Sequence, residues 1–303
     1  MYINEKSFED TIEDKYQIIN RVEQFVELLY RLAKDYRLED IYYCGSSIPR
    51  WNSVSYPLEK WLSDSSIDKD LQRQWMNLMN KVNLYEEDKS YSFIYQNMDI
   101  AAGAETVLND SYMVSFVSDE KWLSDALVGN FVVLDEITGE VIESEECVCN
   151  LTQKEQIPYC EFVKNESVEE VDSYEQMWNK REKWFPNLEF CPSVERDLKS
   201  LEVGYIHQVW KRLKELDEYA KVYGNERFDK NKLKHVSPET ENTLKMYQKE
   251  HTFCDTDGKS RIFSWHSRFT GVQGRIFFFP NYREDKILIG YIGKKLKNAS
   301  YPT

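Results

Sequence analysis

The sequence lacks the features of exported and membrane-spanning chains. Its first residues, Met1 to Glu5, contain no basic segment followed by an apolar one, so they do not resemble a secretory signal. No run of about 18 apolar residues occurs in the sequence, as a helical membrane span would require. These absences predict a cytoplasmic protein with no membrane partner.

Glycine and proline are scarce, with 11 and 8 among 303 residues, which is too few for a disordered or collagen-like chain. No segment repeats at a period of about 20 to 50 residues, which argues against a solenoid. Phosphate-binding loops and the nucleophile elbow of serine hydrolases are also missing. The hydrophobic content of 41% instead predicts one large globular domain or two modest ones.

Cysteine is limited to six residues, and in a reducing cytosol we expect these to be free thiols. Cys147, Cys149 and Cys160 could supply three zinc ligands, but their spacing differs from the two-residue knuckle of zinc sites. The alternation of Cys147 and Cys149 is typical of a strand. Carboxylate pairs at 135–136 and 145–146 lie in ordinary acidic runs. We therefore expect no metal and no other cofactor.

Aromatic side chains and charge, by contrast, are abundant. The 20 Tyr and 8 Trp predict a core built from rings, or alternatively a surface on which bases or a peptide stack. The formal net charge of −14 is uneven, because residues 1–203 carry −21 and residues 204–303 carry +7. The acidic part favours solubility. The basic part suits contact with phosphates, or docking against the acidic part.

Hydrophobic periodicity predicts an α+β protein whose first domain, residues 1–152, is of mixed α/β type. Apolar residues at helical spacing predict a long helix over 8–36, with a capping sequence at Ser7–Asp10. The other predicted elements of this domain are strands at 41–44, 91–95 and 112–117, helices at 56–63, 68–83 and 100–108, and a hairpin of 131–137 with 140–149.

Residues 153–192 have the composition of an irregular connector, and residues 193–303 are expected to hold a helical segment and a basic β-meander. The predicted helices begin at Ser193, span 205–223, and begin again at Ser237, where Pro238 suits the first helical position. Three β-rich runs follow at 261–269, 275–280 and 286–292. Their short polar or glycine-bearing links predict a three-stranded antiparallel meander.

Side-chain alternation gives the first strand of this meander a polar face. Ile262, Ser264, His266 and Arg268 lie on one side, and Phe263, Trp265, Ser267 and Phe269 lie on the other, which we expect to be the core side. His266 and Arg268 would then point to solvent. Arg275 begins the neighbouring strand, and Tyr291 ends the third one.

These residues combine cations with proton-transfer groups and lack a matching carboxylate cluster. Arg and Lys can stabilise charge on a pentavalent phosphate, while His or Tyr transfers protons. RNA supplies its own nucleophile, the 2′-hydroxyl, so that neither a metal nor a protein nucleophile is required. The predicted catalytic residues are His266, Arg268, Arg275, Tyr291 and Lys294, and the predicted RNA-binding residues are Arg261, Lys295 and Lys297. The alternative is a solvated basic edge whose lysines prevent aggregation.

A family resemblance supports the RNA hypothesis. Arg275–Phe279, followed by a turn and Lys286–Lys295, resembles the terminal strands of the RelE/HigB toxin superfamily, which are small ribosome-dependent messenger-RNA endonucleases. The resemblance covers about thirty residues, and the chain is longer and more acidic than those toxins. It implies a microbial toxin-like or phage-defence protein, in which an acidic N-terminal part controls a tail that acts on RNA or at the ribosome.

A second hypothesis is a non-enzymatic interaction subunit of a microbial defence or counter-defence complex. Its acidic surface would bind a nucleic-acid-handling protein. Clustered acids on one face of residues 1–203 would favour this hypothesis, and a concave basic patch on the tail would favour the nuclease. The chain contains four His and many acids for a Ser-His-Asp triad, but no serine lies in a recognisable elbow.

Overall fold

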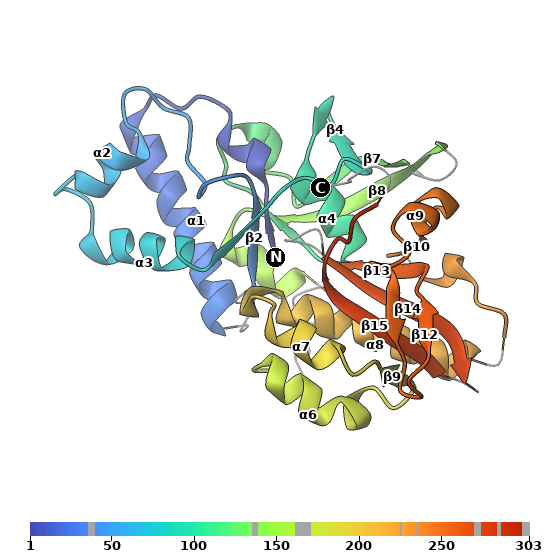
Figure 1. Ribbon diagram of the computed structural model, residues 1–303. Helices are drawn as coiled ribbons and strands as arrows, with labels where there is room; N and C mark the ends of the chain where they lie inside the picture. The colour runs from blue at the N-terminus through green and yellow to red at the C-terminus, as the bar shows by residue number, and fades with distance from the viewer. Residues whose placement is uncertain are drawn as a thin grey trace. The chain divides into compact units, whose positions relative to one another are not determined.

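The computed structural model describes residues 1–35, 40–134, 139–160, 171–224, 226–233, 235–269, 274–283 and 286–298. The chain forms an N-terminal unit, Met1–Ser167, and a C-terminal unit, Val168–Thr303, whose elements are labelled in Figure 1. Both units contain helices and strands, which confirms the α+β prediction. Within the described residues, no helix has the length and apolar character needed to cross a membrane.

An eight-stranded mixed sheet organises the N-terminal unit. Its order is β3 (Val82–Tyr85), β2 (Ile41–Cys44), β1 (Tyr2–Ile3), β6 (Met113–Val114), β8 (Val141–Leu151), β7 (Ala126–Leu134), β4 (Tyr91–Tyr95) and β5 (Met98–Asp99). Neighbours run parallel from β3 to β8 and antiparallel from β8 to β5. The predicted hairpin is therefore present as β7 and β8.

The first helix begins later than the capping pattern predicts. Glu5–Phe8 forms a short 3-10 turn, η1, and α1 spans Lys15–Asp35. The Asp14 carboxylate accepts hydrogen bonds from two backbone amides of the first turn of α1 and so caps it. The described residues of this unit also form α2 (Leu58–Ser63), α3 (Lys69–Met79), α4 (Ala101–Leu108) and the 3-10 turns η2 (Glu120–Trp122) and η3 (Lys154–Tyr159).

Aromatic rings fill the core beside α1. Trp61 and Trp75 are fully buried, and their ring centroids lie 6.2 Å apart. The ring of Trp51 lies 5.7 Å from that of Trp75, with an angle of 77° between the planes, the edge-to-face arrangement that aromatic pairs prefer. Phe25 and Phe116 complete this cluster. These rings form a core and not a stacking surface.

A polar network fills the position where open α/β sheets commonly bind ligands. From β1 the chain adds β2 and β3 on one side of the sheet and then β6 on the other side of β1. A topological switch point therefore lies between β1 and β6. There, the side chain of Asn4 donates to Ser115 Oγ at 2.9 Å, and Ser115 donates to Asn150 Oδ1 at 2.7 Å. Asn150 in turn donates to two backbone carbonyls. The protein's own side chains therefore occupy this crevice.

The C-terminal unit has a five-stranded sheet and not a three-stranded one. Its order is β10 (Val236–Pro238), β13 (Trp265–Phe269), β14 (Gly274–Arg283), β15 (Lys286–Lys294) and β9 (Leu188–Phe190). The three central strands are antiparallel, as predicted, but β10 adds an antiparallel strand and β9 a parallel one. Each added strand has only three residues, which is too short to give a recognisable alternation.

The first predicted strand of the meander is divided between two sheets. Ser260–Ile262 forms β12, which pairs with β11 (Thr252–Cys254) in a separate two-stranded sheet. Only Trp265–Phe269 belongs to the large sheet. Arg261 and Ile262 therefore lie on a different sheet from His266 and Arg268, contrary to the prediction of one continuous strand.

The predicted helix at Ser237 is also wrong, because Val236–Pro238 forms β10. The following helix, α9, starts at Glu241, and the hydroxyl of Thr240 caps it by accepting a hydrogen bond from the amide of Thr243. Pro238 is tolerated because β10 lies at the edge of the sheet. The remaining helices are α6 (Tyr174–Trp184), α7 (Val194–Lys199), α8 (Ile206–Tyr223) and the 3-10 turns η4 (Val203–Tyr205) and η5 (Lys230–Lys232).

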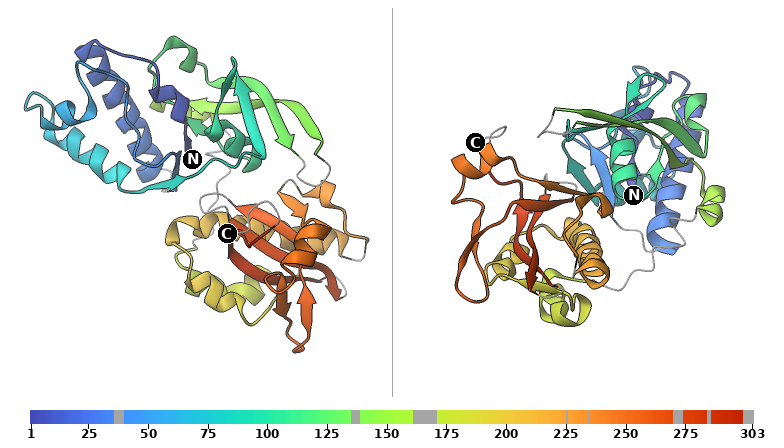
Figure 2. Two further views of the ribbon diagram at one scale, coloured as in Figure 1. Left: turned by 45° about the horizontal axis from the view of Figure 1, so that its top comes forward. Right: turned by 90° about the vertical axis from the view of Figure 1, so that its right-hand side faces the viewer.

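The long helix α8 lies against one face of the large sheet, where it contacts β13 and β15 (Figure 2). The side chain of Arg212 on α8 is fully buried and donates to the backbone carbonyl of Arg268 at 3.1 Å. The strands present Phe269, Ile276 and Phe278 on this side, all of them buried. The opposite face of the sheet carries the polar residues described next.

Candidate functional site

A row of side chains crosses four strands on the face opposite α8. Ser237 on β10 pairs with His266 on β13, His266 pairs with Phe277 on β14, and Phe277 pairs with Tyr291 on β15. In the adjacent row, Arg268 pairs directly with Arg275. Side chains of directly paired residues share one face of a sheet. We call this set, Ser237, His266, Arg268, Arg275 and Tyr291, the polar face.

The polar face is not the solvent-exposed surface that alternation predicts. His266 and Arg268 are each 8% exposed and Arg275 is 5% exposed. The segment before β12 covers part of this face, where the ring of His251 lies 5.1 Å from that of Phe277, and Phe253 stacks on Tyr291 at 5.7 Å. Alternation along one strand cannot reveal such a cover, which comes from residues on a different sheet.

His266 lies between a hydroxyl and a carboxylate. Ser237 Oγ is 2.9 Å from Nε2 of the ring, and Glu239 Oε1 is 3.3 Å from Nδ1. The second distance is that of an ion pair, and among the described residues Nδ1 has no partner that meets the geometry of a hydrogen bond. With Glu239 ionised, the favoured tautomer carries its proton on Nδ1. Nε2 is then the acceptor for the hydroxyl of Ser237.

The surroundings keep this imidazole neutral. Burial lowers the pKa of His266 below its ordinary value, and the positive charges of Arg275 and Lys295 lower it further, while Glu239 opposes the shift. Burial raises the pKa of Glu239, but the contact with His266 and the charge of Arg275 oppose burial, and the pKa lies below its ordinary value. A neutral imidazole held by an ionised carboxylate is the form in which His acts as a general base.

Two guanidinium groups lie beside this base. Arg268 and Arg275 are paired across β13 and β14, and the side chain of Arg275 donates to the carbonyl of Gly274 at 3.0 Å. Because arginine presents a planar fork of donors, two such residues on adjacent strands suit the oxygens of one phosphate group. Ser237, Tyr291 and Lys295 are only half-buried, so they bring this cluster to the surface of the unit.

Three of the residues proposed from the sequence, Lys294, Lys297 and Arg261, stand apart from the cluster. Lys294 pairs with Gly274, so it lies on the face opposite Arg275, and its side chain is exposed. Lys297 is also exposed, and its carbonyl oxygen lies 3.0 Å from Nε2 of His251. Tyr291 lies on the polar face, but its hydroxyl donates to the carbonyl of Lys294 at 3.2 Å. Burial raises the pKa of Tyr291, which disfavours its ionisation.

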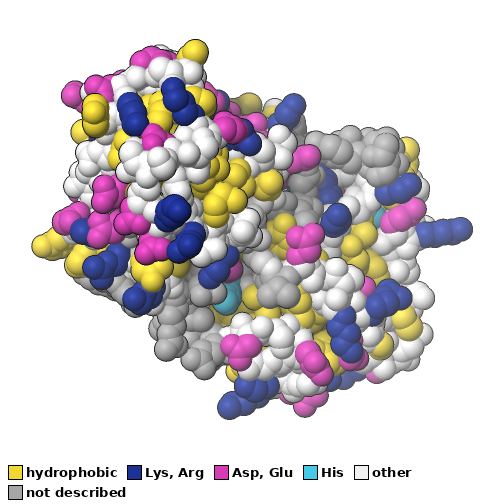
Figure 3. Space-filling view, turned by 90° about the vertical axis from the view of Figure 1, so that its left-hand side faces the viewer, with side chains coloured by type: hydrophobic (Ala, Val, Ile, Leu, Met, Phe, Trp, Pro, Cys, Tyr) yellow, Lys and Arg dark blue, Asp and Glu magenta, His cyan; other side chains and the backbone are white. Residues whose placement is uncertain are grey.

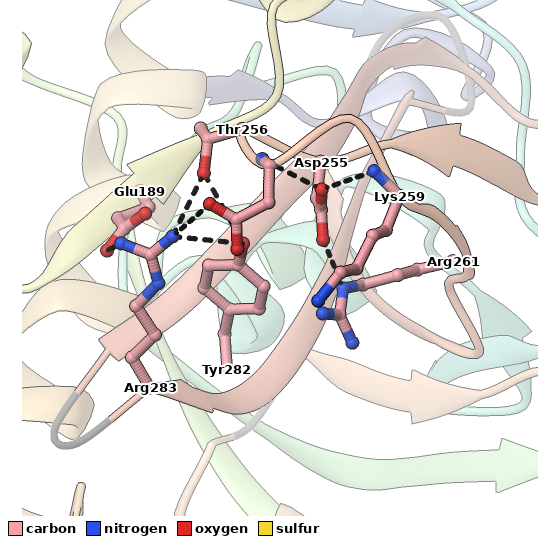
Figure 4. Close-up of polar contacts among 8 residues, drawn as sticks. Glu189, Asp255, Thr256, Lys259, Arg261, Tyr282 and Arg283 are labelled. Carbon is pink, nitrogen blue, oxygen red and sulfur yellow. Dashed lines mark hydrogen bonds and ion pairs between the residues drawn. The ribbon is translucent and has the colours of Figure 1, made fainter.

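Arg261, the third of these residues, is engaged within the small β11–β12 sheet (Figure 4). Its Nε donates to the buried carboxylate of Asp255 at 2.5 Å, and its guanidinium lies over the ring of Tyr282 at 5.0 Å. The other oxygen of Asp255 accepts from the amide of Lys259 at 2.8 Å and closes the hairpin turn. The charge of Arg261 is therefore balanced by a residue that shapes this hairpin.

Two residues of the candidate site, Ser237 and Glu239, are absent from the residues that the sequence pattern predicts. Ser-Pro-Glu matches the start of a helix, which is the wrong interpretation of this segment. In the structure, Ser237 lies on β10 and Glu239 directly follows it, and both side chains lie around His266. The interpretation of this segment as a helix start therefore hides both residues.

The N-terminal unit contains a close pair of thiols. Cys149 and Cys160 are free thiols whose sulfur atoms lie 3.4 Å apart, and Cys147 is exposed. Among the described residues, no three His, Cys, Asp or Glu side chains gather as a metal site would require. The carboxylates at 135–136 lie outside the described residues.

Comparisons with protein-family models, with curated proteins and with solved structures give no match. We therefore infer function from the geometry of the polar face and of Glu239 and Lys295 around it.

Replacing Glu239 by glutamine is expected to lower the pKa of His266 further, because the carboxylate is the group that supports the protonated ring. An NMR titration of the imidazole protons would measure the shift, with His266→Gln identifying the resonance. Glu241→Gln is the matched control, since the side chain of Glu241 is 91% exposed and pairs with Lys245. An unchanged titration in Glu239→Gln would show that this carboxylate does not act on the ring.

Proposed function

We propose that the C-terminal unit binds RNA and cleaves it without a metal ion. His266 is the general base, and Arg268 and Arg275 bind the phosphate. The observation that supports this proposal most strongly is a buried imidazole between Glu239 and the hydroxyl of Ser237, on the same sheet face as two cross-strand arginines. The +7 charge of residues 204–303 would attract the RNA backbone. The resemblance of the last strands to RelE/HigB toxins agrees with the same activity.

The hydrogen bond of Ser237 indicates where the reacting hydroxyl would bind. In the free protein, the Ser237 hydroxyl lies 2.9 Å from Nε2 of His266. A ribose 2′-hydroxyl in that position would give its proton to Nε2 while its oxygen attacks the adjacent phosphorus. The bond from phosphorus to the 5′-oxygen then breaks with its electron pair on that oxygen, which takes a proton from solvent, and the protonated ring of His266 releases its proton to solvent. The products are a 2′,3′-cyclic phosphate and a new 5′-hydroxyl, and the arginines stabilise the charge that develops on phosphorus.

The test uses the full-length chain and an end-labelled single-stranded RNA in the presence of a chelator. Cleavage is expected, and it should disappear at a position where a single 2′-deoxynucleotide replaces the ribonucleotide. The fragments should carry cyclic phosphate ends, which mass spectrometry identifies. Cleavage that survives the 2′-deoxy substitution would contradict the 2′-hydroxyl mechanism. Intact RNA after prolonged incubation would contradict the activity itself.

A second candidate function is protein binding by the N-terminal unit, as part of a toxin-like or phage-defence system. The β7–β8 hairpin exposes apolar side chains, with Val128 53% and Val141 57% exposed, on the same face as the carboxylates of Glu143 and Glu145. Such a surface would suit a partner that is both apolar and basic. On the face shown in Figure 3, however, acidic and basic side chains are interspersed. That face offers no acidic patch for mimicry of a nucleic acid.

A further inference from the structure

We propose that Ser237 is itself a nucleophile, and that the C-terminal unit attacks phosphodiesters that have no 2′-hydroxyl by forming a phosphoryl-serine. The substrate class is an anionic phosphodiester with a stable leaving group. This inference depends on the proposed function for one point, the binding of phosphate by Arg268 and Arg275. The nucleophile in this reaction is Ser237 of the protein, whereas in RNA cleavage it is the 2′-hydroxyl of the substrate.

The geometry is that of an activated serine. Its hydroxyl oxygen is 2.9 Å from Nε2 of His266, and the opposite ring nitrogen is 3.3 Å from a carboxylate oxygen of Glu239. A nucleophile, a base and a group that orients the base therefore follow one another within contact distance. The three side chains come from a short strand and its neighbour, so no elbow motif is needed to bring them together.

Rigid elements hold these side chains in place. Ser237 and Pro238 are in register with His266 and Trp265, and the amide of Glu239 donates to the carbonyl of Ser264 at 2.7 Å. Thr240 begins α9 directly afterwards by capping it. The backbone around Ser237 and Glu239 is thus fixed on both sides of His266, as a preorganised site requires.

A purely structural role explains less of this arrangement. A structural serine needs one hydrogen-bond partner, which the imidazole alone supplies. Such a role does not account for a carboxylate on the far side of the ring, because burying Glu239 with His266 requires desolvation of both groups. On the same face lie two further buried cations, Arg268 and Arg275. Together these groups complete a site for an anionic ester.

The reaction would proceed in two steps. Ser237 Oγ gives its proton to Nε2 of His266 and attacks phosphorus, and the bond to the leaving oxygen breaks with its electron pair. The protonated ring then releases its proton to solvent, which the positive charges of Arg275 and Lys295 favour. In the second step, a water molecule gives a proton to Nε2 and attacks phosphorus. The Oγ–phosphorus bond breaks, and Oγ takes the proton back from the ring.

The probe is bis(4-nitrophenyl) phosphate, whose nitrophenolate leaves without a proton and is measured by its colour. We expect a burst of one nitrophenolate per chain from the full-length protein. Acid quenching followed by intact-mass measurement should show one 4-nitrophenyl phosphoryl group, and peptide mapping should place it on Ser237. Ser237→Ala should lose both signals, whereas the control Ser260→Ala, on exposed β12, should keep them. Ser237→Cys should recover an adduct, as a thiophosphate ester.

Thermal melting of each variant establishes that it is folded. A wild-type chain without an adduct, an adduct on another residue, or an adduct that persists in Ser237→Ala would overturn the proposal. The two proposals can fail separately. If the wild-type protein cleaves RNA but is never labelled, the nucleophilic role of Ser237 is excluded and RNA cleavage is not. If Ser237 is labelled but RNA stays intact, the nucleophilic role is supported and RNA cleavage is excluded.

Discussion

Arg275→Lys is expected to slow RNA cleavage by the full-length chain by about 10²- to 10³-fold, the range typical for loss of one preorganised donor to the transition state. Lysine keeps the positive charge that lowers the pKa of His266. What is lost is the planar fork that faces Arg268 across the two strands. Single-turnover cleavage of an end-labelled RNA would measure the rate, with binding measured separately.

The matched control is Arg283→Lys, because Arg283 ends the same strand, β14, at its far end. Arg283 is about half exposed and pairs with Asp257 at 2.9 Å, away from His266. Its substitution should leave the cleavage rate within about twofold, as for most exposed side chains away from a site. Equal losses in the two variants would indicate a general effect of charge. A full rate in Arg275→Lys would remove Arg275 from the proposed machinery.

The strands that could be predicted from the sequence are those long enough to show a pattern of apolar residues. The central strands β13, β14 and β15 were found because aromatic and aliphatic residues alternate or run together between polar links. The two-residue strand β1, which lies between β2 and β6, gives no such signal. The parallel order of the N-terminal sheet could therefore not be deduced, since it depends on contacts between short strands far apart in the chain.

The site was predicted in part, and the missing part has a physical explanation. His266, Arg268 and Arg275 were grouped correctly on one face, because register within a meander follows from its turns. Their burial was missed because His251 and Phe253, which cover part of that face, belong to a separate hairpin segment. Ser237 and Glu239 were missed because a Ser-Pro-Glu sequence is compatible with both a helix start and an edge strand.

The N-terminal unit should lose stability as the pH rises toward neutrality, because of Glu5. This residue follows β1, and its carboxylate accepts hydrogen bonds at 2.6 and 3.1 Å from the amides of Ala101 and Ala102, at the start of α4. Burial raises the pKa of Glu5 from 4.5 to about 7, although these amides and the charge of Lys6 oppose the shift. Between these two pH values the folded chain retains a proton that the unfolded chain has released.

Stability therefore falls as the pH rises through this range, since the unfolded state binds fewer protons than the folded state. At about 1.4 kcal/mol per pKa unit, the loss is on the order of 3 kcal/mol, a large share of the stability of an ordinary domain. Glu5→Gln, which cannot ionise, is expected to remove this dependence. The variant should match the wild type in acidic buffer and exceed it by about that amount in mildly alkaline buffer.

Urea unfolding at a series of pH values, followed by tryptophan fluorescence, would measure the difference between the two chains. The fluorescence reports on the N-terminal unit through Trp51, Trp61 and Trp75, which are all buried there. Glu9→Gln is the control, because the side chain of Glu9 is 64% exposed and pairs with Lys6 on the surface. Parallel pH curves for Glu5→Gln and the wild type would show that Glu5 ionises freely in the folded chain. A curve that becomes flat only in Glu5→Gln would identify the carboxyl group at the start of α4 as the group that titrates.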